Sequence, residues 1–330
     1  MSKQKIPSLN KNNPEEKREF DILNLEEKYF YLLADVFDSK DFKKSLKETE
    51  EWTNYHYLNL HTWKKSNKVQ LACQRLVFFN VLKTLDKEII GTYNSSISSD
   101  VAFETKDAVI NIDSKTINFD KNKLDWKRPF FGPNQSSFRN INWGTKGNEN
   151  TNFGGFKVQF NLFPYDNFLG KPVLSYLISF LYRDKKGDDK FSWYRDNDRE
   201  EKEFKSNLKL TVIPNGLISH YFENDLIVGV KDYNYKKDGN SYVEYDKKED
   251  IPNQYDLEPI TVGTKDGWYD PITKTPWLET SRGTGKERKI VYGHCTGINN
   301  VRMDYEELRF RKNGQNTPWD ALKSWQINNE

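Results

Sequence analysis

The chain has 330 residues with 51 Lys and Arg against 49 Asp and Glu, so its formal net charge is only +2. That balance excludes a uniformly basic or acidic protein, and a surface for a polyanion has to come from local segregation of charge. Aromatic residues make up 15% of the chain, which is enough to build a core and excludes a disordered polymer. The length allows one large or two medium domains.

We expect neither a signal peptide nor a membrane-spanning segment from the sequence. Residues 1–20, MSKQKIPSLNKNNPEEKREF, are polar and predicted to be loose, with no apolar region of a signal peptide. The sequence contains no run of about 18 apolar residues, the length that a membrane-spanning helix needs. Cys73 and Cys295 are the only cysteines, which argues against a disulfide framework. We therefore expect a soluble cytoplasmic protein without a membrane partner, and the Asn- and Lys-rich composition suggests a bacterial source.

Helical periodicity runs from Leu23 to about Leu85. Apolar residues at spacings of three and four form two stripes, at Leu25, Tyr29, Leu32, Leu33 and Val36 and at Val69, Ala72, Cys73, Leu76, Phe79 and Leu82. We expect Gly91 to end this helical part.

After Gly91 the pattern is that of β-strands. The segments KPVLSYLISFLYRD and LKLTVIPNGLISHYFENDLIVGVKDY are rich in aromatic and β-branched residues. The polar stretches 118–156 and 232–289 exceed the usual loop length, so they are either functional loops or contain further elements. The sequence predicts one α/β core with a β-rich extension.

The segment SSDVAFETKDAVINIDSKT, residues 98–116, predicts a hairpin with a two-residue turn at Lys106 and Asp107. This register sets Asp100 opposite Asp113. It gathers Val101, Phe103, Ile110 and Ile112 on one apolar face. The other face carries Asp100, Glu104, Asp113 and Lys115.

Two opposed carboxylates repel each other unless a cation lies between them. A divalent cation would offset that repulsion, and hard oxygen ligands favour Mg²⁺ over zinc. A lysine beside such a pair can hold or help deprotonate a water, or stabilise charge on a phosphate.

An acid, then a strand and turn, then Asp-x-Lys at the end of the second strand resembles the PD-(D/E)XK nuclease motif. The context SSDVAFE…INIDSKT after a long helix is most similar to type II restriction endonucleases, over about residues 68–116. The resemblance implies a mixed central sheet flanked by helices, with Asp100 and Asp113 as metal-binding acids and Lys115 as the catalytic lysine. Ser99 stands before Asp100 where the motif often has proline.

The resemblance also implies a Mg²⁺-dependent endonuclease that cuts double-stranded DNA at specific sites and leaves 5′-phosphate ends. A homodimer and a cognate DNA methyltransferase would be its partners. Residues 21–160 would form the helical segment and nuclease core. Residues 161–330 would continue the core with DNA-binding or dimerisation elements.

Three further acids are candidates for the site. Glu88, near the end of the preceding helix, and Glu104, deeper along the hairpin, could be accessory acids. Asp107 is an alternative to Asp100 as the first acid, but its place at the turn tip favours Asp100.

Two basic segments stand out from the neutral chain, each with a local net charge of +4. In residues 126–160 the candidate DNA contacts are Lys127, Arg128, Asn134, Gln135 and Arg139. In residues 281–312 they are Lys286 and Arg288. Such side chains bind phosphates or read base edges, although solvated loops have the same composition.

Other functions remain open. A repair or branched-DNA nuclease of the same superfamily is one alternative, and a glycan-binding β-domain with nine tryptophans is another. The four histidines show no metal-ligand spacing, which argues against zinc chemistry.

Overall fold

The computed structural model describes residues 13–55, 68–93, 100–132, 141–143, 156–158, 170–183, 191–195, 207–213, 227–283, 285–303 and 325–326. Its helices are α1 (Pro14–Asp38), α2 (Lys40–Tyr55), α4 (Lys68–Thr84) and the short α5 (Lys123–Lys127). Pro14 suits the first turn of α1 because that turn leaves its amide groups unbonded. No helix within these residues is long and apolar enough to cross a membrane.

The first sheet has the strand order β1-β2-β3-β7-β9-β18, with β8 also paired to β7. Its strands are β1 (Ile89–Tyr93), β2 (Val101–Thr105), β3 (Val109–Asn118), β7 (Val173–Arg183), β8 (Ser192–Trp193), β9 (Leu208–Ile213) and β18 (Trp325–Gln326). Strands β3 and β7 run parallel, whereas the other neighbours are antiparallel. The expected α/β fold with a mixed central sheet is confirmed.

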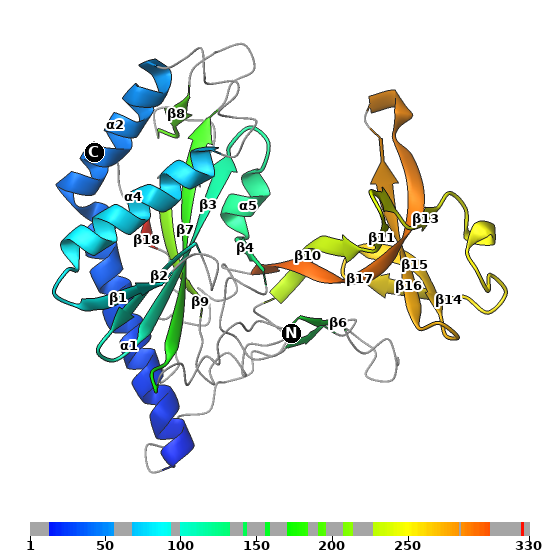
Figure 1. Cartoon of the computed structure of the whole chain (residues 1–330), viewed down its shortest axis with the longest axis horizontal. Coiled ribbons are helices and arrows are strands. Elements are labelled where there is room, and N and C mark those ends of the chain that lie inside the picture. The colour runs from blue at the N-terminus through cyan, green and yellow to red at the C-terminus, as the bar shows by residue number, and fades with distance from the viewer. Residues whose placement is uncertain are drawn as a thin grey trace, which may run out of the picture.

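One face of this sheet packs against α1, α2 and α4 (Figure 1). The apolar residues on that face share a single core with the helices: Phe103, Ile110, Ile112, Tyr176, Ile178, Leu210 and Val212. The predicted apolar set of the hairpin therefore lies where the register placed it.

The opposite face of the same strands is buried but largely polar. Alternate positions on β3, β7 and β9 carry Asn111, Asp113, Lys115, Ser175, Ser179, Lys209 and Thr211. Trp126 of α5 packs on this face, in a small cluster with Ile117 and Leu181. A parallel strand buried on both faces is usually apolar throughout, so a buried polar face points to a functional surface.

A second sheet forms the C-terminal extension, here called the arm (residues 227–303). Its strand order is β10-β17-β16-β15-β14, and β13 and β4 also pair with β17. The strands are β10 (Ile227–Tyr235), β13 (Glu244–Tyr245), β14 (Glu258–Val262), β15 (Lys265–Asp270), β16 (Thr275–Arg282) and β17 (Lys289–Met303), with β4 (Phe130–Phe131) from the core. Figure 1 shows β10 and β17 extending from the core to the rest of the arm.

Smaller elements complete the structure. The two-stranded pairs are β5 (Ile141–Trp143) with β6 (Phe156–Val158), and β11 (Lys237–Asp238) with β12 (Ser241–Tyr242). The 3₁₀ turns are η3 (Lys248–Asp250) and η4 (Gly285–Glu287). Stretch 232–289 therefore contains strands of the arm rather than one long loop. Cys73 and Cys295 are both buried and carry free thiols.

Two helix predictions need correction. The third helix ends at Thr84, and Gly91 lies inside β1 instead of ending it. Phe79 was expected on the buried stripe but is 63% exposed, because the stripe that packs on the sheet follows Val69, Cys73, Val77 and Val81. Phe79 is two residues from both Val77 and Val81, and two residues turn a helix by about 200°, so its side chain points away from the face that packs on the sheet.

Candidate active site

The hairpin of β2 and β3 has the predicted register. Val101 pairs with Ile112 and Phe103 with Ile110, while the Thr105 amide donates to the Ala108 carbonyl across the turn at 2.9 Å. Asp100 therefore lies at the open end of the hairpin, next to Asp113 on β3.

Asp113 and Lys115 form a buried ion pair on β3. The Lys115 Nζ lies 2.8 Å from Asp113 Oδ2, and the two side chains are 9% and 1% exposed. Residues two apart on a strand project from the same face, so the backbone of β3 itself holds this pair together.

Asp100 is held against the same strand by Ser114. Its Oδ2 accepts hydrogen bonds from the Ser114 amide and from the Ser114 hydroxyl, both at 2.9 Å. The two bonds orient the carboxylate and leave its other oxygen for a further ligand.

Burial raises the pKa of Asp113 from 3.8 to about 7. This pKa is the net result of three effects: the negative charge of Asp100 adds to the rise caused by burial, while Lys115 acts in the opposite direction. The site is therefore short of positive charge when both acids are ionised.

The donor set suits a hard divalent cation. Asp113 Oδ1 and Asn111 Oδ1 are buried and accept no hydrogen bond in the part of the chain that the structure describes. Within that part no three His, Cys, Asp or Glu side chains cluster, so a cation would take its other ligands from water or substrate oxygens. Two carboxylates with an unused buried oxygen fit Mg²⁺.

Residues 15–189 match the family described as type II restriction enzyme MwoI, N-terminal domain. The match spans more than half of the chain. The chain belongs to this family of type II restriction enzymes. It is therefore a site-specific DNA endonuclease, and the predicted resemblance to type II restriction endonucleases is confirmed.

Among solved structures, the chain is similar to the restriction endonuclease BglI, crystallised bound to its DNA recognition sequence. The identity is 13%, the TM-score is 0.44, and the alignment covers 89% of this chain and 94% of BglI. No curated protein matches the chain.

The two accessory acids do not join the site of this endonuclease. Glu104 is ion-paired with Lys171 at 2.6 Å and accepts a hydrogen bond from Tyr93 at 2.7 Å. Glu88 is exposed in the turn before β1. Because the next residue, Ile89, pairs with Thr105, Glu88 lies at the turn end of the hairpin and far from Asp113.

Asp107 connects the hairpin turn of the endonuclease to helix α1. Its carboxylate accepts hydrogen bonds from Tyr29 and from Lys28, the latter at 2.8 Å, and so ties α1 to the hairpin turn. It lies at the end of the hairpin opposite to Asp100. This geometry supports the preference for Asp100.

The candidate DNA contacts on the core are only partly described. Lys127 and Arg128 are exposed at the end of α5. Asn134, Gln135 and Arg139 lie outside the described residues.

On the arm, Lys286 and Arg288 are exposed between β16 and β17. Their neighbour Arg282 is paired with Glu244 at 2.6 Å, and Lys289 with Asp246 at 2.7 Å. The internal pairs leave Lys286 and Arg288 as the better candidates for an external anion.

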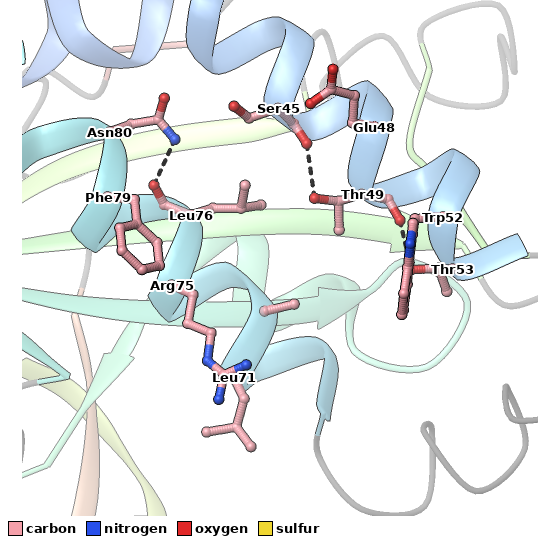
Figure 2. A pocket seen from close by; sticks show the side chains of 11 residues that line it. Ser45, Glu48, Thr49, Trp52, Thr53, Leu71, Arg75, Leu76, Phe79 and Asn80 are labelled. Carbon is pink, nitrogen blue, oxygen red and sulfur yellow. Dashed lines mark hydrogen bonds between the residues drawn. The ribbon is translucent and has the colours of Figure 1, made fainter. Parts of the chain in front are cut away.

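A hollow of about 660 Å³ lies between α2 and α4 (Figure 2), and neither Asp100 nor Asp113 lines it. Trp52 and Phe79 line it, and the polar groups of Thr49 and Asn80 bond to carbonyls of their own helices. Among the described residues that line it, Glu48 is the only carboxylate and Arg75 the only cation. It therefore lacks the paired acids of a cation site.

The prediction missed several polar residues on the buried polar face of the first sheet. Ser179 Oγ and Thr211 Oγ1 are buried there and have no hydrogen-bond partner among the described residues. Lys115 lies beside Ser179, which lies beside Lys209 on β9. The alternation of LKLTVI, with Lys209 and Thr211 between apolar residues, is a signal in the sequence that could have found two of them.

Proposed function

We propose that the endonuclease hydrolyses phosphodiester bonds of double-stranded DNA with Mg²⁺, using Asp100, Asp113 and Lys115. The observation that carries this is the buried Asp113–Lys115 pair, 2.8 Å apart, at the open end of the hairpin where Asp100 is oriented by Ser114. Family membership supports the DNA substrate.

Each residue has a distinct part. Asp100 and Asp113 would hold the cation through their free carboxylate oxygens, and the cation would supply Lewis-acid stabilisation of the charge that develops on the scissile phosphate. Lys115 would orient the attacking water and donate a hydrogen bond to the phosphate. In-line attack of water on phosphorus, with the 3′ oxygen as the leaving group, would leave a 5′-phosphate and a 3′-hydroxyl.

The partners follow from the substrate. A palindromic target has a two-fold axis, so we expect a homodimer, with Lys286 and Arg288 contacting phosphates. A methyltransferase of the same specificity would protect the host DNA. Membership in the restriction-enzyme family speaks against the glycan-binding alternative.

The test is digestion of unmethylated phage DNA by the purified protein with Mg²⁺ or EDTA. Asp113→Ala removes a proposed ligand. Asp107→Asn is the matched control, because it alters an acid of the same hairpin that lies away from the site.

Discrete Mg²⁺-dependent fragments that Asp113→Ala abolishes and Asp107→Asn retains are the expected result. Religation of those fragments without kinase treatment would establish the 5′-phosphate ends. A smear in place of bands would favour a superfamily nuclease without site specificity. Equal cleavage by Asp113→Ala and the unchanged protein would refute the assignment of the site.

A further inference from the structure

The point where the arm joins the core lies beside the proposed catalytic lysine. Strand β4 pairs with the end of β17, so that Phe131 faces Val301 and Phe130 faces Arg302. Because β4 follows α5 closely in the sequence, the arm is attached to the segment that covers the polar face of the sheet.

A buried carboxylate strengthens this junction. Asp125 of α5 is 5% exposed, and its Oδ1 lies 2.8 Å from Arg302 Nη1 on β17. Its Oδ2 forms an ion pair with Lys231 on β10. One acid of the core thus binds a cation from each of the two strands that carry the arm.

The ring of Phe130 links the junction to the site. Lys231 Nζ lies 3.4 Å from the ring centroid, and Lys115 Nζ lies 4.8 Å from the same centroid. Lys115 therefore contacts both Asp113 and an aromatic ring that a lysine of the arm also contacts. Cations are attracted to the face of such a ring, most strongly where water is excluded.

We propose that Phe130 is a positioning residue for Lys115, and that Lys231 and Asp125 set the place of its ring. Movement of the arm would then change the orientation of Lys115, so that engagement of DNA by the arm and assembly of the site are coupled. The consequence for activity rests on the proposed function of Lys115, whereas the contact between ring and lysine does not.

The first experiment observes Lys115 directly and needs no activity. The lysines are labelled with ¹³C at the ε-carbon, and the Lys115 resonance is assigned with Lys115→Arg. The ring of Phe130 should shift this resonance upfield, and Phe130→Leu should remove the shift while Phe130→Tyr keeps it. Lys231→Met should displace the resonance as well, because the ring loses its second cation.

A matched control comes from the arm. Tyr242 also lies under two cations, Arg282 at 3.9 Å and Lys237 at 4.8 Å from its ring centroid. Tyr242→Leu should leave the Lys115 resonance unchanged. If Phe130→Leu leaves the chemical shift of Lys115 unchanged, the proposal is wrong.

The second experiment measures cleavage. Phe130→Leu should lower kcat about tenfold with little change in KM, the effect expected from one cation–ring contact in a partly dry site, and Phe130→Tyr should retain most of kcat. Lys231→Met should have no further effect on kcat in the Phe130→Leu background, since both act through one ring.

The two experiments separate the two claims. Absence of cleavage by the unchanged protein would refute the proposed function, and the resonance would still decide whether the ring positions Lys115. Normal cleavage with additive effects of Phe130→Leu and Lys231→Met would refute the coupling alone.

Discussion

The replacement Asp113→Asn should stabilise the metal-free protein while abolishing cleavage. In the folded chain the pKa of Asp113 is raised from 3.8 to about 7 by burial and by the charge of Asp100, so the ionised carboxylate destabilises the fold. At about 1.4 kcal/mol for each pKa unit, the penalty at pH 8 is at most about 4 kcal/mol. Asparagine has nearly the same shape and carries no charge.

Proton linkage determines whether the stability of the fold rises or falls with pH. Between pH 4 and 7, roughly, the folded protein binds the Asp113 proton more tightly than the unfolded chain does, so stability falls as the pH rises through this window. The advantage of Asp113→Asn should therefore be full at pH 8 and vanish near pH 4. Mg²⁺ should stabilise the unchanged protein and have little effect on the variant.

Urea unfolding at pH 8 and pH 5 in EDTA measures the effect, with the same substitution at Asp125 as the control. Asp125 is also buried, but it pairs with Lys231 and Arg302, so Asp125→Asn should cost about 3 kcal/mol by leaving two cations unpaired. If Asp113→Asn is destabilising at pH 8 to a similar extent, attraction to Lys115 outweighs burial and the reasoning fails.

Two further predictions concern the hairpin turn and the arm. Burial favours a higher pKa for Asp107, but hydrogen bonds from Lys28 and Tyr29 outweigh it and lower the pKa, so this acid stabilises the fold above about pH 4 and the stabilisation is lost in stronger acid. Asp107→Asn should cost only about 1 kcal/mol at pH 7, because the side chain is 39% exposed, and thermal unfolding at pH 7 and pH 3 would show the difference. Replacing Lys286 and Arg288 by alanine should weaken DNA binding equally for specific and random sequences and reduce the slope of log K against log salt by about two. Fluorescence anisotropy over a salt series tests this, and a loss confined to the specific sequence would contradict it.

The hairpin of β2 and β3 could be predicted from the sequence because the pattern that determines it is local. Alternation over residues 101–112 assigns each side chain to a face, and a two-residue turn leaves one register. Asp100, Asp113 and Lys115 follow from that register. The roles of these residues remain a proposal, whereas their proximity is a property of the fold.

The arm could not be predicted in the same way. Strand β14, EPITV, begins with a charge and a proline, and β15, KDGWYD, is mostly polar, so neither has the composition of a core strand. Strand β14 is the edge strand of its sheet and β15 is its neighbour, and each has residues that are exposed to solvent. Polar composition is expected for such strands and resembles that of a loop.

The junction between arm and core depends on contacts that no local pattern encodes. Asp125 and Arg302 are 177 residues apart, and Asp125 lies in a segment that reads as an ordinary polar turn. A buried acid, however, requires partners wherever they come from in the chain, and its two cations belong to the strands that carry the arm. Because the ring of Phe130 contacts both Lys231 and Lys115, the residues that attach the arm are linked to the proposed catalytic lysine through one side chain. A substitution that loosens the arm should therefore change the position of Lys115, even though it alters none of Asp100, Asp113 and Lys115.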